Sequence, residues 1–175
     1  MALPSTIFKA ELQISDMNRG YYDTHSITVA RHPSETDERM MMRILAYALH
    51  ASERLTFAGG LSSTEEPDLW ERDLSGAITL WIMVGQPDEK QIKKSLSKSP
   101  RVVVYWYGNK KCDLNELGAK FKNLNIISVP PAASLAMAKL AQRTMKIQYT
   151  IQDSYVWLTM NDVSIEFNLS SSPEC

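Results

Sequence analysis

The residues best suited to chemistry lie in the middle third of the chain, where carboxylates and lysines flank one predicted strand. Asp68 follows Pro67 shortly before the apolar run 80–84, and a lysine-rich segment follows that run. Hard divalent cations such as Mg²⁺ bind oxygen ligands, and carboxylates can hold such an ion beside a phosphodiester. A lysine can steady the attacking water or the developing negative charge. The strand at 78–84 and its flanks are therefore where the sequence places any chemistry.

The elements that must position these residues begin with a predicted hairpin of two strands, at 7–15 and 26–30. A helix is expected over 35–54, with Ser34 as its N-cap. Its apolar residues recur at helical spacing, which predicts one buried face and one exposed basic face. The residues concerned are Met41, Leu45 and Leu49 inside, and Arg39 and Arg43 outside.

After the first helix the chain alternates predicted strands and helices up to residue 141, and from residue 145 its apolar residues recur at the strand spacing of two. Strands are predicted at 78–84, 102–107 and 125–129, and helices at 88–97, 113–122 and 132–141. Strands linked through helices favour parallel pairing, so the strands at 78–84 and 102–107 should be neighbours. The stretch 62–73 is acidic and turn-rich, and three short alternating strands occupy 145–169. The predicted class is α/β (α+β), a mixed sheet with flanking helices, an N-terminal hairpin and a C-terminal antiparallel meander.

Composition favours a single cytoplasmic domain over residues 1–175, with a frayed tail at 170–175. The N-terminus lacks a signal-peptide pattern, and no apolar run is long enough to span a membrane. Cys112 and Cys175 form neither a disulfide framework nor a zinc spacing. A net charge of −1 argues against coating nucleic acid electrostatically, so any such contact must be local. The densest basic segment holds Lys90, Lys93, Lys94, Lys98 and Arg101.

Longer motifs run through nearly the whole length of the chain. They are Ala30-Arg31-His32-Pro33-Ser34-Glu35-Thr36 with Glu38 and Arg39, Trp81-Ile82 running into Gly85 and Pro87-Asp88-Glu89, and Ile151-Gln152-Asp153. In these motifs the chain resembles the YaeQ family. The resemblance implies a fold similar to the PD-(D/E)XK, or restriction-endonuclease-like, superfamily. It also implies a link to transcription, so nucleic acid or the transcription machinery are the implied partners.

The resemblance also implies an incomplete nuclease site. Asp68 matches the superfamily's aspartate, as a metal ligand and catalytic residue, and Glu38 matches an outlying helical carboxylate that would share the metal. Met83 stands where the second-strand carboxylate belongs, and a thioether is a weak ligand for Mg²⁺. Gly85 stands at the lysine position, so the nearest amines are on the following helix. The candidate catalytic lysines there are Lys93 and Lys94, and Mg²⁺ is expected to bind weakly.

Each candidate residue has a structural interpretation beside the functional one. Glu38 can complement a helix dipole, and Asp68 can cap a turn after Pro67. The lysines can form a solvated helix face. Met83 can be a packing residue: if a helix covers its face of the strand it belongs to the core, and if that face opens on a cleft it replaces a ligand.

Three functions remain open from the sequence. The favoured one is a domain that binds nucleic acid, or a partner that processes it, without cutting, because Met83 removes an anionic ligand. The alternative is an active Mg²⁺-dependent phosphodiesterase in which Asp68 and Glu38 hold the metal with a further ligand from Glu65, Glu66 or Asp88, and a lysine of the helix at 90–94 assists. The third is a protein-interaction domain, which the near-neutral net charge permits.

Overall fold

The computed structural model of the chain describes residues 3–59, 61, 63, 65–108 and 113–170, with only the backbone of 113–115. Within this part, no helix is long and apolar enough to cross a membrane. Both cysteines lie outside the described residues, and so does the predicted frayed tail from residue 171 onward. Ser170 is described and pairs with Ser128 in an isolated bridge.

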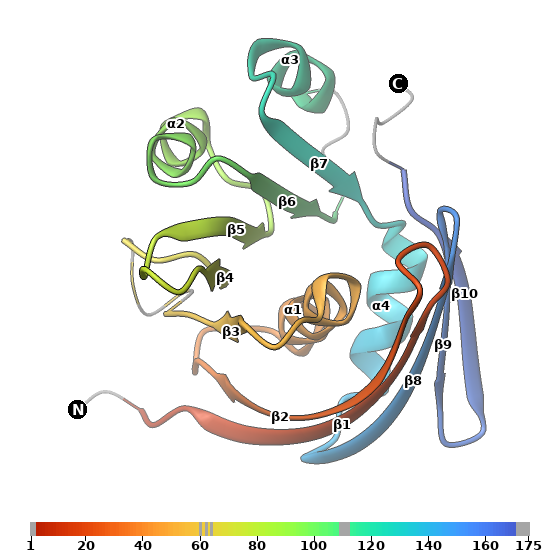
Figure 1. The fold of residues 1–175 in the computed structure, drawn as a ribbon. Coiled ribbons are helices and arrows are strands. Elements are labelled where there is room, and N and C mark those ends of the chain that lie inside the picture. The colour runs from red at the N-terminus through yellow and green to blue at the C-terminus, as the bar shows by residue number, and fades with distance from the viewer. Residues whose placement is uncertain (1–2, 60, 62, 64, 109–112, 171–175) are drawn as a thin grey trace.

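The first sheet joins the two ends of the chain in the strand order β10-β9-β8-β1-β2 (Figure 1). Its strands are β1 (Thr6–Asp16), β2 (Tyr21–Arg31), β8 (Thr144–Gln152), β9 (Tyr155–Met160) and β10 (Val163–Asn168). β1 and β2 form the predicted hairpin, and β8 to β10 form the predicted meander. β8 pairs in parallel with β1. Along β1 and β8 buried and exposed residues alternate, so the sheet has one covered face and one face in water.

The second sheet has the strand order β3-β4-β5-β6-β7. Its strands are β3 (Leu55–Phe57), β4 (Leu69–Arg72), β5 (Ile78–Val84), β6 (Val102–Trp106) and β7 (Leu124–Ser128). β5, β6 and β7 are parallel, which confirms that the strands predicted at 78–84 and 102–107 are neighbours. β6 is buried along its whole length because helices cover both of its faces. β3 and β4 pair antiparallel beside β5.

Two sheets replace the single mixed sheet that the sequence predicted, although each of the two is itself mixed. The meander extends the hairpin and does not join β5 to β7. In the hairpin and in the meander apolar and polar residues alternate, so each has one apolar face. Side by side, the two apolar faces cover one side of a common core. β3 and β4 were missed because each is very short, and β4 lies inside the stretch 62–73 that was interpreted as turns.

Helix α1 (Asp37–His50) lies between the two sheets. It is buried without a break from Met40 to Ala48, which confirms that Met41 and Leu45 are inside. The predicted exposure of its arginines is wrong: Arg43 is buried, and the side chain of Arg39 is only 15% exposed. The prediction assumed a helix on the surface of one sheet, whereas a helix between two sheets has no free face.

The ends of α1 also differ from the sequence prediction. Its N-cap is Thr36, whose side chain accepts a hydrogen bond from the Arg39 N–H, because the Ser34 hydroxyl is bonded to the His32 ring. The helix ends at His50 and does not continue to residue 54. Helix α4 (Pro131–Lys139) packs beside α1, and it begins one residue before and ends two residues before the predicted range 132–141.

Two helices cover the outer face of the second sheet, opposite α1 (Figure 1). They are α2 (Glu89–Lys98) and α3 (Asp113–Lys120), close to the predicted ranges. α2 begins with a capping box in which the Asp88 side chain accepts from the Gln91 N–H and the Gln91 side chain bonds the Asp88 N–H. A small apolar layer beneath these helices contains Val104, Trp106 and Ile126, with Met83 packed against it.

Candidate functional site

A cleft of about 280 Å³ opens beside the carboxyl end of β5. Its lining comes from the end of β5, from α2 on one side, and from the segment before β4 on the other. Asp68, Met83 and Lys94 all line it, together with Arg39 and Trp81. Three of the residues singled out from the sequence therefore share one hollow.

Asp68 is buried in this cleft and has both carboxylate oxygens occupied. The backbone N–H of Asp68 bonds to the Ile82 carbonyl, which aligns it with the end of β5. Its Oδ2 accepts the Val84 backbone N–H at 2.8 Å, and its Oδ1 accepts from Arg39 Nη2 at 2.7 Å. The carboxylate that the resemblance assigns to a metal is thus held by an arginine and a strand N–H.

Arg39 belongs to a row of paired, mostly buried charges at the start of α1. Its Nη2 also donates to the Val84 carbonyl at 3.2 Å, and its Nη1 lies 3.8 Å from Glu35 Oε1. Glu35 in turn accepts two bonds from Arg43, at 2.8 Å and 3.0 Å. Alternating charges of this kind tolerate burial because each is paired with an opposite one. The row fixes the guanidinium of Arg39 against Asp68.

Met83 is partly covered by a helix and also faces a cleft, which the sequence analysis treated as alternatives. On one side its sulfur accepts a 3.4 Å hydrogen bond from the Ser95 hydroxyl of α2, and it packs against the layer around Val104. On the other side it lines the cleft. The side chain is therefore a packing residue that also occupies the floor of the candidate site.

The other predicted site residues are distributed unevenly. Lys94 lines the cleft and pairs with Glu65 across it, and this contact lowers the pKa of the Glu65 carboxyl. Lys93 does not line the cleft and pairs with Glu89 at 2.9 Å. Glu38 accepts a 2.6 Å hydrogen bond from the Ser134 hydroxyl of α4 and does not line the cleft either. The structure groups Asp68 with Lys94, but not with Glu38 or Lys93.

The donor set around Asp68 fits Mg²⁺ poorly. Among the described residues, no group of three His, Cys, Asp or Glu side chains is placed to hold a metal ion. Asp68 would have to leave Arg39, and Met83 offers sulfur where Mg²⁺ prefers oxygen. Gly85, at the lysine position, has a φ of 117° and open space where a Cβ would stand. The cleft keeps room for a ligand but lacks two of the groups that metal-dependent cleavage needs.

Arg39 and Trp81 are the residues of this site that sequence reasoning missed. A signal for Arg39 was present, because Glu35, Arg39 and Arg43 recur every four residues and so share one helix face. That face was assigned to solvent. Trp81 was part of a family motif, but no role in the site was assigned to it.

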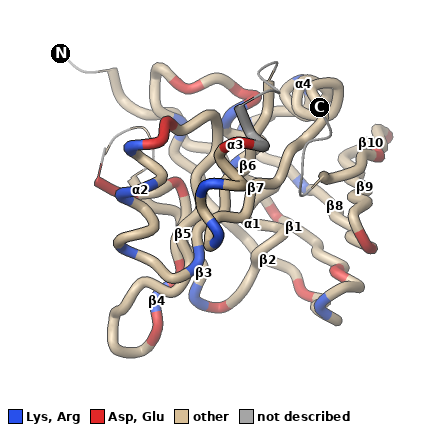
Figure 2. The backbone as a smooth tube through the Cα atoms, turned by 90° about the horizontal axis from the view of Figure 1, so that it is seen from above, with Lys and Arg blue, Asp and Glu red and all other residues tan. Residues whose placement is uncertain are grey.

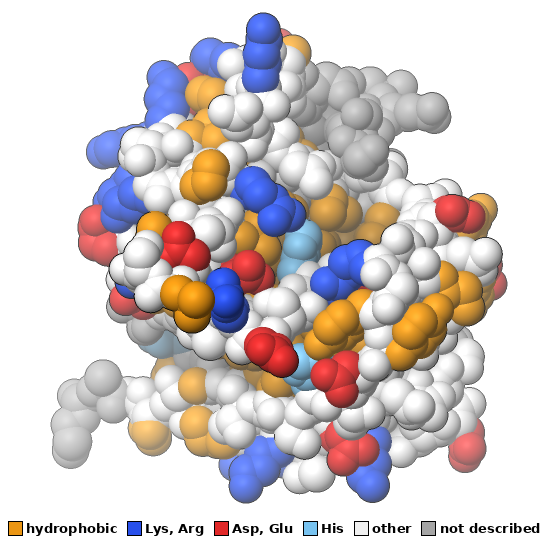
Figure 3. All heavy atoms as spheres, viewed as in Figure 1, with side chains coloured by type: hydrophobic (Ala, Val, Ile, Leu, Met, Phe, Trp, Pro, Cys, Tyr) orange, Lys and Arg blue, Asp and Glu red, His pale blue; other side chains and the backbone are white. Residues whose placement is uncertain are grey.

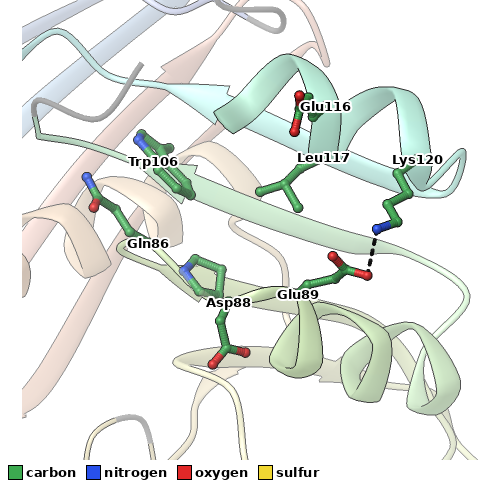
Figure 4. A pocket seen from close by; sticks show the side chains of 8 residues that line it. Gln86, Asp88, Glu89, Trp106, Glu116, Leu117 and Lys120 are labelled. Carbon is green, nitrogen blue, oxygen red and sulfur yellow. Dashed lines mark ion pairs between the residues drawn. The ribbon is translucent and has the colours of Figure 1, made fainter. Parts of the chain in front are cut away.

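A second hollow of about 360 Å³ lies on the other side of Gln86 and Pro87, between α2 and α3. Figure 4 shows Trp106 and Leu117 along its apolar side, and Glu89 paired with Lys120 at its rim. That ion pair is 2.8 Å long, and together with Lys93 it lowers the pKa of Glu89 to about 2. Of the residues that the sequence assigned to the site, this hollow contains only Asp88, the N-cap of α2, and not Asp68, Glu38, Lys93 or Lys94.

Known proteins resemble the chain along almost its entire length. A family model described as "YaeQ protein" matches residues 1–169. "Uncharacterized protein YaeQ" from Escherichia coli (strain K12) is 38% identical over 98% of this chain and 97% of its own length, and the protein of the same name from Salmonella typhi matches equally.

Two solved structures share the fold. The crystal structure of YaeQ protein from Xanthomonas axonopodis pv. citri has a TM-score of 0.88 and 44% identity, over 97% of this chain and 99% of that one. The YaeQ protein from Pseudomonas syringae has a TM-score of 0.87 and 37% identity, over 96% of each chain. With the motifs at both ends of the sequence, these matches show that the chain belongs to the YaeQ family.

Proposed function

We propose that this protein binds nucleic acid through the cleft and the adjoining face of α2, and does not cut it. The observation that carries the proposal is the pairing of Arg39 with Asp68. A nuclease site needs a free aspartate and a second hard ligand, whereas here an arginine holds the aspartate and Met83 replaces the second ligand. The site keeps the position for a phosphate without the means to activate water through a metal.

The layered arrangement around β5 supports a restriction-endonuclease-like core. A parallel unit β5-α2-β6-α3-β7 is covered by α1 on one face and by α2 and α3 on the other. Asp68 directly precedes β4, and Met83 lies near the end of β5, the strand that pairs antiparallel with β4. The positions of Asp68 and Met83, side by side at this end of the sheet, would suit recognition of one phosphate of a nucleic-acid backbone.

The charge distribution supports nucleic acid as the ligand. Residues 89–101 contain five basic side chains and one acidic one, although the chain as a whole carries −1. Figure 3 shows Lys and Arg gathered at the part of the surface formed by α2 and α3. By contrast β9 and β10, from 155 to 168, contain no Lys or Arg, and Figure 2 shows the same asymmetry along the backbone. A local basic face is what a near-neutral protein needs for phosphate contacts.

The proposal is tested by fluorescence anisotropy with labelled single-stranded RNA and DNA over a range of salt concentrations. The first variant, Lys90→Gln with Lys93→Gln and Lys94→Gln, removes three charges from α2. The matched control removes three exposed lysines elsewhere, at positions 9, 139 and 146. We expect the α2 variant to bind at least about tenfold more weakly and to lose about two units of log–log salt slope, at ~0.7 per phosphate contact.

The control triple should bind like the natural sequence. An equal loss in both triples, or none in the α2 triple, would contradict a local phosphate contact. Incubation with Mg²⁺ or Mn²⁺ tests the alternative function. Cleavage that Asp68→Ala abolishes would replace the proposal with an active phosphodiesterase.

A further inference from the structure

Two donors of residues that line the cleft make no hydrogen bond within the part of the chain that the structure describes, although one of them, Arg39 Nη1, has Glu35 Oε1 3.8 Å away. They are Nη1 of Arg39 and Nε1 of Trp81, and each exposes less than 1 Å². The whole of Trp81 is 96% buried, being 4% exposed. A buried donor left without an acceptor costs about 1–3 kcal/mol, so such groups usually have a reason to persist. Both belong to residues that line the same cleft, which points to a ligand rich in acceptors.

Arg39 supplies a fixed cation at the place where a metal would be expected. Its Nη2 contacts Asp68 Oδ1 and the Val84 carbonyl, which are the oxygens that β4 and β5 present at this end of the sheet. A guanidinium is charged at every physiological pH, and its planar fork matches the oxygens of a phosphate. The cleft therefore has a permanent positive group that does not depend on metal concentration.

A carboxylate of the chain already lies against the lysine side of the cleft. Glu65 is exposed, pairs with Lys94 and has its Oε2 3.5 Å from Lys98 Nζ. The same Lys98 nitrogen is 5.6 Å from the centre of the Trp81 ring. Glu65 thus brings an anionic group to the edge of the site, beside both lysines and the indole. Exposed ion pairs of this kind are weak, so a stronger anion can displace it.

We infer that the cleft binds a phosphate group without a metal, with Arg39 as the resident cation and Trp81 Nε1–H and Lys94 as further donors, in competition with the Glu65 carboxylate. This inference rests on the proposed nucleic-acid function and names the group that the cleft recognises. The open space above Gly85 leaves room for the phosphate beside Asp68. Lys94 changes partners on binding, from the carboxylate of Glu65 to the ligand.

The first test follows the tryptophan indole N–H signals by NMR while inorganic phosphate is added in the presence of EDTA. The four signals are assigned with single Trp→Phe variants. We expect the Trp81 signal to shift and saturate. The signal of Trp157, on β9 of the other sheet, should stay in place. No saturable change at Trp81, or an equal change at Trp157, would overturn the inference.

Two substitutions with opposite expected effects sharpen the test by calorimetry. Trp81→Phe removes the donor and keeps most of the ring, so phosphate affinity should fall about tenfold while the protein stays folded. Glu65→Gln removes the competing charge, so affinity should rise about threefold. A purely structural Trp81 would leave phosphate affinity unchanged in the Phe variant, and that result would refute its role as a donor. A fall in affinity on Glu65→Gln would contradict the competition.

A third arm separates free phosphate from nucleic acid as the source of the group. Inorganic phosphate is compared with a single-stranded oligonucleotide, using the same Trp81 signal. A shift with both ligands supports the inference and the proposed function together. A shift with phosphate alone keeps the phosphate site and rejects nucleic acid as its source. Oligonucleotide binding that needs the α2 lysines but leaves Trp81 unmoved keeps the proposed function and overturns this inference.

Discussion

The two sheets face the same helix, yet they surround it with different chemistry. The first sheet presents apolar side chains to α1 and α4, such as Leu12, Ile14 and Ile147, and a polar outer face to water. The second sheet also packs on α1, but its β4–β5 end meets a row of buried charges. That row runs from Arg43 through Glu35 and Arg39 to Asp68.

The difference is one of energetic cost, because apolar and charged side chains contribute differently to stability when they are buried. Apolar burial in the first sheet is favourable wherever it is complete. Buried charges add little to stability compared with apolar residues of the same shape, and they are costly when one partner is lost. Their concentration beside one cleft makes that end of the second sheet the place to look for a ligand.

The largest expected effect breaks the charge row itself. Arg43→Met leaves the Glu35 carboxylate buried at 3% side-chain exposure without its main partner. We expect a loss of about 3–5 kcal/mol in the free energy of unfolding, measured with urea, because a buried charge left alone is strongly unfavourable. Lys146→Met, on the outer face of the first sheet, should change stability by no more than about 0.5 kcal/mol.

A double variant controls for the reason behind that loss. Adding Glu35→Leu to Arg43→Met removes the stranded charge, so most of the stability should return. If the double variant is as unstable as the single one, packing by the arginine stem and not the unpaired charge explains the effect.

A smaller effect concerns His50, which ties the end of α1 to the second sheet. Its Nε2 lies 2.7 Å from the Tyr105 hydroxyl. Burial lowers the pKa of His50 to about 4, with help from the charges of Arg19 and Arg101. The unfolded chain, in which the pKa is about 6.5, therefore binds more protons below that pH. Stability should be complete above about pH 6.5 and fall by up to about 3 kcal/mol as the pH approaches 4.

Urea unfolding at a series of pH values measures this slope. His50→Gln should be less stable near neutral pH but should lose less stability on acidification. An unchanged acid slope in that variant would mean that carboxylates, and not His50, set the pH dependence between 6.5 and 4.

The smallest expected effect concerns the metal site that the sequence suggested. Met83→Glu restores a hard oxygen ligand beside Asp68, and calorimetry with Mn²⁺ should show at most about a tenfold gain in affinity, or ~1.4 kcal/mol. The gain is limited because Arg39 and the Val84 N–H already occupy both oxygens of Asp68. Adding Arg39→Met should increase it further. No gain in either variant would leave Met83 and Asp68 with structural roles alone.

Much of the fold could be predicted from the sequence because most elements carry a clear period. The hairpin, β5, α2, β6 and the meander all show their spacing of apolar residues within a short window. The division into two sheets could not be predicted in this way. It depends on β1 pairing with β8, and no local pattern specifies a contact between segments so far apart.

The candidate site was predicted less completely than the fold. Sequence reasoning placed Asp68, Met83 and Lys94 near one another, and all three line the cleft. It could not see that Arg39 holds Asp68, because it treated α1 as a helix with one face in water. An arginine on a helix is exposed if one sheet packs on the helix and buried if sheets pack on both sides. Which of these occurs is decided by the tertiary structure.

The parallel pairing of β1 with β8 also affects how the chain is made. Their side chains contact across 135 residues, for example between Gln13 and Gln148. At a synthesis rate of ~5–20 residues per second, β1 waits on the order of 10 s for its second neighbour after it leaves the ribosome. Until then the edge of β1 that will pair with β8 is unpaired, and an unpaired strand edge promotes aggregation. We therefore expect the nascent N-terminal third to be the stage most prone to aggregation, and slow refolding in vitro should share the same cause.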